Sequence, residues 1–554
     1  MAKKYIQDFK SKLATGGTVS PEELQDFFSR LEGDLKDKKY GLVWESQTEQ
    51  VIEQLKTNKV YLHEDESLKI TQDPDNPKSN ILIEGDNYEA LTYLKEINQK
   101  VDVIYIDPPY NTGNKDFIYN DRFIDKEDGF RHSQWLSFMD DRLRLARELL
   151  TDDGVIFISI DENEFSNLDL LCSEIFGGYN RIAQIVRDMA SFSNDSKNIT
   201  TVHEYVLVYA KNKNLLTFTK DVFDMSAYKY EDIHLKQRGR YKINKMDNGS
   251  MTYSDSMNYP IICPDGSEIY PNSRKSKEND GWNWRWSQKK IEWGIENDFI
   301  VFKKVKGEYK VYYKIYENVD RNLKEIKRGK PYTTIIRSVG TEGNKNIGDI
   351  GMRGLFNYPK PVSLIKYLVN MHPNSNATVL DFFAGSGTTG QAVLGLNKED
   401  GGSRQFILVT NNENNIAREV TYERNKRVIE GYTTPKGKDV SGIPSNLAYY
   451  KTKQVSKYDI DFDEVMLQHI IPTIQLTEGI YRRIRHSKHI LQLGENIFIF
   501  NQYMVEDDEI DTLVGLVKDE DILYIQEGQV DYIKSKLPDG VVYKYLEDVL
   551  PTNR

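Results

Sequence analysis

The stretch Val101-Asp102-Val103-Ile104-Tyr105-Ile106-Asp107-Pro108-Pro109-Tyr110 decides the fold prediction for this chain. Its first six residues are mostly β-branched or aromatic, which is typical of a buried strand. The two prolines then remove two backbone donors and fix φ, so the chain must leave the sheet as a rigid extended loop. We expect Asp107 and Tyr110 to flank this loop at the carboxyl end of the sheet, where ligands bind in open α/β folds.

This loop combines groups that suit a flat, amine-bearing ligand. A carboxylate and a fixed carbonyl can together accept both hydrogens of an exocyclic amine. An adjacent aromatic ring can stack on a nucleobase. A proline-rich strand exit with a capping Asp is the alternative interpretation, and the tetrapeptide alone does not decide between the two.

Outside this loop, short β-branched runs alternate with amphipathic helices, which predicts a mostly parallel α/β sheet. The expected strands are 81–83, 101–106, 154–160, 205–209, 378–382 and 405–410. The expected helices are 88–94, 133–150, 162–176, 362–371, one that starts at 388, and 416–429. The alternation stops near Lys211 and resumes after Pro359-Lys360-Pro361, so we predict one α/β domain that is interrupted by an inserted domain.

We predict five segments along the chain. They are an N-terminal helical segment at 1–60, the two halves of the α/β domain at 61–212 and 346–438, the insertion at 213–345, and a C-terminal α+β segment at 439–554. Ser20-Pro21-Glu22-Glu23 is typical of a capping box that opens a helix ending near Leu35. A second helix is expected at 45–56, and Asp507-Asp508-Glu509 is expected to be a solvated loop.

The composition of the 554 residues fits several domains with apolar cores, because 39% are hydrophobic and 29% charged. No apolar run approaches the roughly 20 residues that span a bilayer, and no apolar stretch follows the first lysines, so we expect neither membrane association nor a secretory signal. Cys172 and Cys263 are too few for a disulfide framework or a cysteine metal cluster. We therefore expect a cytoplasmic protein without a metal site.

The net charge of −11 hides a basic segment. Residues 211–330 hold 25 Lys and Arg against 17 Asp and Glu, and four of the six tryptophans. Basic residues interleaved with aromatic ones predict nucleic-acid binding through phosphate neutralisation and base stacking. Lys303, Lys304 and Lys306 form one candidate phosphate strip. A β-rich domain with an aromatic core and solvated lysines fits the same composition equally well.

A second motif is Val379-Leu380-Asp381-Phe382-Phe383-Ala384-Gly385-Ser386-Gly387-Thr388-Thr389-Gly390, a strand that runs through a glycine turn into a helix. The spacing of its glycines matches the dinucleotide pattern GxGxxG, so an NAD-dependent oxidoreductase is one interpretation. However, Asp381 would repel a pyrophosphate at the helix N-terminus, and no Lys follows Gly387 as in a P-loop.

An acid beside a glycine loop instead suits a cationic nucleoside without phosphate, and S-adenosylmethionine has that chemistry. Glu413 follows the next strand, where an acid could hold the ribose hydroxyls. A glycine turn that serves only helix packing is the remaining alternative.

Together the two motifs resemble amino-DNA methyltransferases of the β arrangement, in which a catalytic DPPY precedes the cofactor motif FxGxG. More closely, the chain resembles the modification (Mod) subunit of type III restriction–modification systems. The matching stretches are 83–91 (IEGDNYEAL), 106–121 (IDPPYNTGNKDFIYND), 153–161 (DGVIFISID), 203–212 (HEYVLVYAKN), 381–390 and 409–415 (VTNNENN). The resemblance covers roughly residues 38–435. It implies a Rossmann-like S-adenosylmethionine-dependent methyltransferase fold, with a mixed, mostly parallel sheet and an inserted target-recognition domain.

The resemblance also implies the roles of individual residues. Asp107 and the Pro108 carbonyl would accept the N6 amine of a flipped-out adenine, and Tyr110 would stack on its ring, with Pro109 completing the motif. The implied S-adenosylmethionine site comprises Asp86, Ser363, Asp381, Phe382, Phe383, Gly385, Ser386, Gly387 and Glu413. Asp86 fits a helix N-cap equally well. His203 and Tyr205 would open the strand that closes the base pocket, although His203 is more typical of a strand end than of a catalytic base.

The implied function is base-flipping transfer of a methyl group to adenine N6 in double-stranded DNA. The implied assembly is a homodimer with a separate ATP-dependent restriction (Res) subunit, because the chain itself shows no Walker A sequence. Cytosine-N4 methylation needs the same geometry, although Asp before Pro-Pro-Tyr favours adenine. A solitary methyltransferase and a non-catalytic DNA-recognition subunit are further alternatives.

Overall fold

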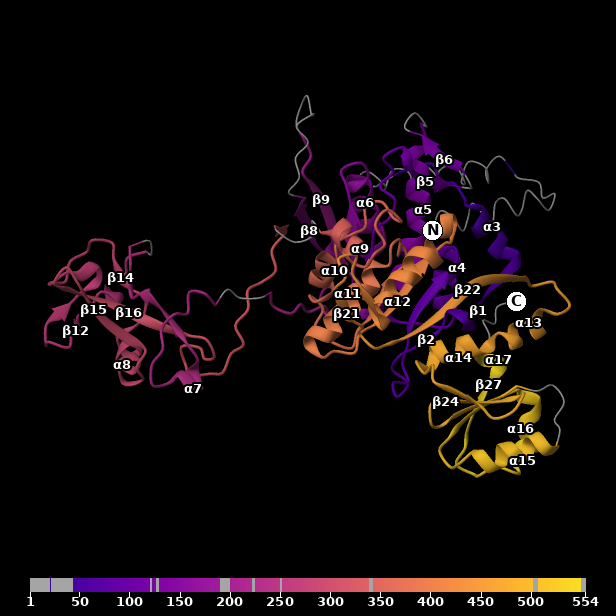
Figure 1. The fold of residues 1–554 in the computed structure, drawn as a ribbon. Coiled ribbons are helices and arrows are strands. Elements are labelled where there is room, and N and C mark those ends of the chain that lie inside the picture. The colour runs from indigo at the N-terminus through magenta and orange to yellow at the C-terminus, as the bar shows by residue number, and fades with distance from the viewer. Residues whose placement is uncertain are drawn as a thin grey trace. The chain divides into compact units, whose positions relative to one another are not determined.

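The computed structural model describes residues 20, 43–119, 122–125, 129–189, 200–221, 225–249, 252–337, 342–501 and 507–549. The chain divides into two compact units, one of residues 1–219 with 333–554 and the other of residues 220–332 (Figure 1). The second unit lies inside the segment 213–345 that the sequence predicts as an insertion.

The larger unit is built on one eleven-stranded sheet. Across the sheet the strands are β1 (Asn58–Glu64), β22 (Asn446–Ser456), β3 (Asn80–Glu84), β19 (Gln405–Thr410), β18 (Thr378–Asp381), β4 (Val101–Ile106), β7 (Leu150–Ile160), β9 (His203–Ala210), β8 (Arg181–Asp188) and β17 (Ile335–Ile336), and β2 (Ile70–Thr71) pairs with β22. All neighbours from β22 to β7 are parallel. β9 is antiparallel to both β7 and β8. The predicted mixed, mostly parallel sheet is confirmed.

The six predicted strands are all present, and β4 and β19 have the predicted bounds. Their β-branched runs are buried because both faces of a parallel sheet are covered. β22 was not predicted as part of this sheet. It belongs to the segment 439–554 that was expected to be a separate C-terminal segment, yet it pairs in parallel with β3.

Two groups of helices cover the sheet (Figure 1). One group is α4 (Asn87–Glu96), α5 (Arg131–Leu149) and α6 (Phe165–Cys172), and the other is α10 (Val362–Val369), α11 (Thr388–Asp400) and α12 (Glu423–Glu430). α5 connects β4 to β7 and α11 connects β18 to β19, in opposite directions along the sheet. Since parallel crossovers are right-handed, the two groups lie on opposite faces. The strand order therefore reverses between β18 and β4, which is where open α/β sheets bind ligands.

Several predicted helices differ from the observed ones at their ends. The helix predicted at 45–56 is α3 (Gln50–Thr57). The two helices predicted at 162–176 and 416–429 contain π-helical turns at Ser173–Gly177 and Ile416–Tyr422. The helix expected from Ser20 to Leu35 lies outside the described residues beyond Ser20. In the part of the chain that the structure describes, no helix has both the length and the apolar composition needed to span a bilayer.

The C-terminal part of the larger unit carries a second sheet. Its strands, in order, are β23 (Arg483–Arg485), β24 (Ile490–Leu493), β25 (Ile497–Phe500), β26 (Ile522–Ile525) and β27 (Val542–Tyr545). The prediction of a loop at Asp507-Asp508-Glu509 was wrong, because these residues begin α15 (Asp507–Leu516). Acidic side chains stabilise the first turn of a helix through its dipole, so this charge run is a helix start.

The inserted unit has its own core. A three-stranded antiparallel sheet of β10 (Tyr241–Lys245), β16 (Glu308–Tyr316) and β15 (Ile300–Val305) packs with α8 (Gln288–Glu296). The side chains of Trp284 and Trp286 are only 1% and 3% exposed. Much of the aromatic content of this segment therefore builds the core, as the alternative interpretation of its composition required.

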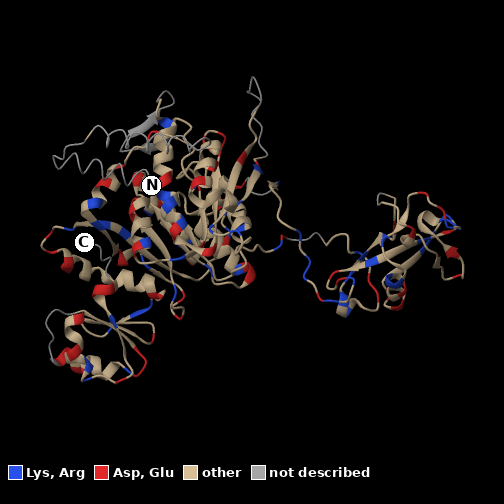
Figure 2. Cartoon of the chain, turned by 180° about the vertical axis from the view of Figure 1, so that it is seen from behind, with Lys and Arg blue, Asp and Glu red and all other residues tan. Residues whose placement is uncertain are grey.

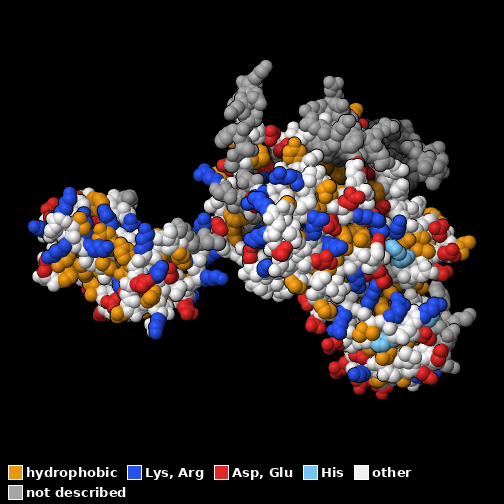
Figure 3. Space-filling view, viewed as in Figure 1, with side chains coloured by type: hydrophobic (Ala, Val, Ile, Leu, Met, Phe, Trp, Pro, Cys, Tyr) orange, Lys and Arg blue, Asp and Glu red, His pale blue; other side chains and the backbone are white. Residues whose placement is uncertain are grey.

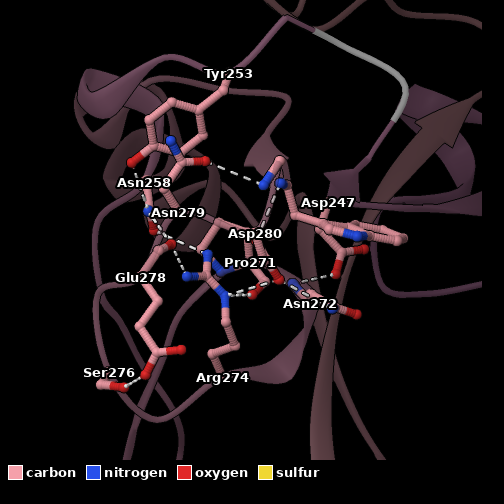
Figure 4. Close-up of polar contacts among 12 residues, drawn as sticks. Asp247, Tyr253, Asn258, Pro271, Asn272, Arg274, Ser276, Glu278, Asn279 and Asp280 are labelled. Atoms are coloured by element: carbon pink, nitrogen blue, oxygen red, sulfur yellow. Dashed lines mark hydrogen bonds and ion pairs between the residues drawn. The ribbon is translucent and has the colours of Figure 1, made fainter.

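Arg274 holds an irregular loop of the inserted unit in place through hydrogen bonds and an ion pair (Figure 4). Its Nε donates to the Pro271 carbonyl at 2.9 Å and its Nη2 donates to Oδ1 of Asn258 at 3.2 Å. It also forms an ion pair with Asp280 at 3.2 Å and donates to the carbonyl of Glu278. Arg274 thus has a structural role within the unit.

The lysines of β15 do not form the predicted strip. Lys303 and Lys304 are consecutive in the strand, so their side chains point to opposite faces. The Nζ of Lys303 lies 4.9 Å from the centroid of Tyr230, and that of Lys304 lies 4.7 Å from the centroid of Tyr309. Basic and acidic residues are interspersed over the unit (Figure 2). On the face seen in Figure 3, Lys and Arg lie among apolar side chains.

The two segments that lead into and out of the inserted unit pair with each other. The N–H of Asp221 donates to the carbonyl of Lys330 at 2.9 Å, and the N–H of Lys330 donates to the carbonyl of Asp221 at 3.2 Å. Just before the unit, Thr219 donates to the carbonyl of Met371 at 2.8 Å. The entering and leaving segments of the insertion therefore run side by side at Asp221 and Lys330.

Candidate active site

The DPPY loop (Asp107–Tyr110) begins directly after β4, as the sequence predicts. Trp135 on α5 is fully buried, and its Nε1 donates to the Pro109 carbonyl at 2.7 Å. Asn111 closes the loop with φ 56°, a left-handed conformation that Asn tolerates. Its Nδ2 donates to Oε1 of Glu164 at 2.5 Å. The loop is therefore held at Pro109 and at its end.

A charged cluster surrounds the side chains of the DPPY loop. The Nζ of Lys360 lies 3.3 Å from Oδ1 of Asp107 and 2.9 Å from Oε2 of Glu204. The same Nζ donates to the hydroxyl of Tyr110. Arg187 on β8 pairs with the other carboxylate oxygen of Glu204. Three strands and the segment before α10 thus meet at this point.

The pKa values in the cluster follow from burial and from these ion pairs. Burial raises the pKa of Asp107, while Lys360 opposes the rise. Burial opposes the charge of Glu204, but Lys360 and Arg187 outweigh it and lower its pKa. Burial likewise opposes the charge of Lys360, and Asp107 and Glu204 raise its pKa in spite of it. The ion pairs therefore favour the charged forms of Glu204 and Lys360, whereas burial disfavours the charged form of Asp107.

The second motif reaches the same edge of the sheet. β18 pairs in parallel with β4, so Asp381, the last residue of β18, and Asp107, which follows β4, lie at neighbouring strand ends. Oδ1 of Asp381 accepts the N–H of Phe383 at 3.0 Å, and its Oδ2 accepts the hydroxyl of Thr389 at 2.5 Å. Burial raises the pKa of Asp381 to about 7, with a smaller contribution from Asp107. The structure thus brings the two sequence motifs together.

The glycine turn between β18 and α11 is packed against the next helix. Gly385 and Gly387 have φ of 48° and 71°, which favour glycine. A Cβ on Gly387 would lie 2.6 Å from Nδ2 of Asn425 and 3.0 Å from the carbonyl of Thr421. Gly387 is therefore required by close packing, whereas a Cβ on Gly385 would meet the ring of Phe356 at 3.3 Å and the carbonyl of Phe383 at 3.7 Å.

Ser386 joins the turn to Arg424, a residue that sequence reasoning missed. Nη1 of Arg424 donates to Oγ of Ser386 at 3.0 Å and to Oγ1 of Thr388 at 2.6 Å. Burial lowers the pKa of Arg424 to about 9. A buried cation thereby holds the glycine turn through hydroxyl groups.

Phe382 and Asp86 are joined by the start of α4. Nδ2 of Asn87 donates to the Phe382 carbonyl at 2.9 Å, and Arg142 donates to Asn87 at 2.5 Å. Asp86 caps α4 by accepting the N–H of Tyr88 at 2.7 Å, so it is the N-cap that the sequence allowed.

Three further predicted residues occupy different environments. The ring of Phe383 packs against Phe382 and Phe138, with centroids 5.2 and 5.8 Å apart. Ser363 lies in the first turn of α10, and its Oγ is buried without a hydrogen-bond partner. Glu413 is exposed in the short turn that follows β19.

The residue of β9 that reaches the charged cluster is Glu204, not His203 or Tyr205. Nε2 of His203 hydrogen-bonds the hydroxyl of Tyr205 at 2.8 Å, on the opposite side of the strand. Side chains alternate along a strand, so a residue between the two predicted ones had to face the other way. The alternation of side chains along the strand could therefore have predicted that Glu204, rather than His203 or Tyr205, faces the DPPY loop.

Residues 101–433 match a family described as DNA methylase, whose members modify the N6 or N4 amine. The chain belongs to this N6/N4 DNA methylase family. Its members take the methyl group from S-adenosylmethionine. The family assignment supports a DNA methyltransferase over the NAD-dependent oxidoreductase and the non-catalytic subunit that the sequence left open.

Among curated proteins, the EcoPI Mod subunit of Escherichia phage P1 is 33% identical over 72% of this chain and 67% of its own length. The StyLTI Mod subunit of Salmonella typhimurium is 33% identical over 62% of this chain and 54% of its own length. The type II methyltransferase M.KpnI of Klebsiella pneumoniae is 33% identical over 70% of this chain and 93% of its own length. The chain thus spans between half and two thirds of these two Mod subunits.

Proposed function

We propose that this methyltransferase transfers a methyl group to adenine N6 in double-stranded DNA, as a Mod subunit of a type III restriction–modification system. The observation that carries the proposal is the placement of Asp381 at the carboxyl end of β18 and of Asp107 directly after the neighbouring parallel strand β4. Two of the similar proteins carry the name Mod subunit. Asp before Pro-Pro-Tyr favours adenine over cytosine as the target.

The DPPY loop has the acceptors that an exocyclic amine needs. Oδ1 of Asp107 is buried, and its nearest charged neighbour is the ammonium of Lys360 at 3.3 Å, so an amine that reaches this oxygen can form a shorter hydrogen bond with it. We assign the carbonyl of Pro108 as the second acceptor and the ring of Tyr110 as the stacking surface. Two accepted bonds localise the lone pair of the amine on nitrogen, and fixed negative groups stabilise the positive charge that develops there.

The residues around Asp381 fit S-adenosylmethionine. Ser363 offers a buried hydroxyl without a partner to the carboxylate of the methionine part. Asp381 offers a carboxylate to its amino group, and Phe382, Phe383, Gly385, Ser386 and Gly387 line this end. We assign the ribose to Glu413 and the cofactor adenine to the vicinity of Asp86. When bound, the cofactor supplies an electrophilic methyl group on a sulfonium.

The inserted unit supplies target recognition in this proposal. Its aromatic core gives it an independent fold, and its basic side chains are available to position a phosphate backbone. We further propose a homodimer that works with a separate Res subunit. M.KpnI carries the name of a type II methyltransferase, so a stand-alone enzyme is the competing assembly.

Methylation mapping tests the reaction. The full chain is expressed in a host without DNA methylation, and modified bases are mapped across the genome beside an Asp107→Ala variant. We expect N6-methyladenine at one short motif, and none with the variant. N4-methylcytosine at a motif would correct the target base, and an unmodified genome from folded protein would overturn the proposal.

The assembly is tested separately. Mass photometry of the purified chain gives its oligomeric state, and we expect twice the chain mass of 64.4 kDa. Co-purification with the product of a neighbouring helicase-like gene would support the Mod assignment. Full modification by a protein that binds no such product would favour the stand-alone enzyme.

A further inference from the structure

Lys360 is a buried cation in the pocket where the proposed reaction needs negative charge. Its side chain is 13% exposed, and that of Glu204 is 6% exposed. A lysine so close to Asp107 repels a positive amine, so methyl transfer itself gives no reason for its presence. A reason for its presence lies in the substrate-free pocket, where an unpaired carboxylate that is withdrawn from water costs free energy.

The geometry assigns each charged group a place. The ammonium of Lys360 lies between Oδ1 of Asp107 and Oε2 of Glu204, at 3.3 and 2.9 Å. Arg187 pairs with the other oxygen of Glu204. Lys360 also donates to the hydroxyl of Tyr110, which lies 3.4 Å from Glu204. The cations Lys360 and Arg187 and the carboxylates of Asp107 and Glu204 thus form one cluster. The hydroxyl of Tyr110 lies within it.

We propose that Lys360 is a positioning residue that keeps the half-buried Asp107 ionised before the base arrives, and that Glu204 fixes the ammonium of Lys360 for this purpose. The inference rests on the function proposed for Asp107. On base binding, the amine takes the acceptor Oδ1, and Lys360 stays on Glu204. The exchange replaces the 3.3 Å ion-pair contact of Lys360 with Oδ1 by a hydrogen bond from the amine, while the shorter contact of Lys360 with Glu204 at 2.9 Å is kept.

Other ionisable groups bear on the same acceptor. Tyr105 lies on β4 beneath the loop, and Asp381 stands at the end of β18. The charge of Asp107 raises the pKa of both Tyr105 and Asp381, and neither of these two groups is a cation. Among the described groups that act on Asp107, Lys360 is the positive one, so its removal should let Asp107 take up a proton.

Methyl transfer against pH is the first test. Tritiated S-adenosylmethionine and genomic DNA from a methylation-free host are used with wild type, Lys360→Met and Lys360→Arg from about pH 5.5 to pH 9. We expect the acid limb of kcat to move up by about one pH unit in Lys360→Met, so that activity at low pH falls about tenfold more than at high pH. Lys360→Arg should keep the wild-type profile. Loss by one constant factor at every pH would overturn the inference.

Thermal unfolding of the substrate-free chain is the second test, and it needs no activity. In Lys360→Met the folded pKa of Asp107 rises further above its unfolded value, so stability must fall as pH rises. We expect the Tm deficit to grow between about pH 5.5 and pH 8, and adding Asp107→Asn to remove that growth. A deficit that is equal at all pH values would reject the ion pair. An inactive wild type that shows the expected unfolding would instead refute only the proposed function.

Discussion

The hydroxyl of Thr389 donates a 2.5 Å hydrogen bond to Oδ2 of Asp381, which ties the end of β18 to the first turn of α11. Asp381 is buried, and this bond and the N–H of Phe383 are its described polar contacts. The site thus holds a carboxylate without a cation beside it among the described groups. Asp381 therefore titrates near neutral pH, unlike the cation-paired Glu204.

Replacing Asp381 with Asn should stabilise the substrate-free protein at high pH. Its pKa is about 7 in the folded chain against 3.8 as the ordinary value. Between these values the folded state binds more protons, so wild-type stability falls as pH rises through this window. Asp381→Asn lacks that loss, and its free energy of unfolding at about pH 8 should exceed that of wild type by up to about 4 kcal/mol. Urea unfolding at both ends of the window measures this, and an equal gain at each end would contradict it.

Asp107→Asn should separate catalysis from cofactor binding. The amide keeps the shape of the side chain but presents one acceptor and no charge, so kcat should fall by about 10²–10³. S-adenosylmethionine affinity, measured by calorimetry, should change less than about threefold. The matched control is Asp102→Asn at the amino end of the same strand, where Asp102 accepts the N–H of Thr378 at 2.7 Å. The control should retain wild-type kcat, and equal losses in both variants would refute the assignment of Asp107.

Gly387→Ala should destabilise the chain more than Gly401→Ala. Both glycines have φ near 72°, so both substitutions strain the backbone by about 1 kcal/mol. A Cβ at Gly401 meets nothing within 4 Å, whereas at Gly387 it lies 2.6 Å from Nδ2 of Asn425. We expect an additional loss of about 1–3 kcal/mol for Gly387→Ala in chemical unfolding. Similar losses in the two variants would mean that Asn425 moves aside freely.

Arg274→Met should loosen the inserted unit. The substitution leaves the acceptors of Asn258 and Pro271 and the charge of Asp280 without their donor, which costs on the order of 2 kcal/mol. Limited proteolysis of the full chain should cut this unit faster. Lys275→Met, at the exposed neighbouring position, is the control and should behave like wild type. Slow, unchanged cleavage of Arg274→Met would show that the loop does not depend on this guanidinium.

The sequence predicted the local features well, for a physical reason. Strands such as β4 and β19 are continuous β-branched runs, and the turn glycines mark backbone conformations that only glycine adopts easily. Those signals are local, and the parallel sheet then brings the strand ends together without further information. The juxtaposition of Asp107 and Asp381 was predictable on this ground.

The charged cluster was not predictable in the same way. Lys360 and Glu204 meet because β9 runs antiparallel at one side of the sheet and the segment before α10 crosses its edge, and no local pattern records that contact. β22 was missed because its apolar run Leu447–Tyr450 is short and is followed by polar residues. Its partner β3 is far away in the chain.

The paired backbone of Asp221 and Lys330 has an evolutionary consequence. A module whose two connections run side by side can be exchanged for another of any size, because the ends it must join stay the same distance apart. Under the proposed role of this unit in target recognition, recombination at these connections would replace the recognised DNA sequence together with the module. The chemistry at the sheet edge is inherited unchanged.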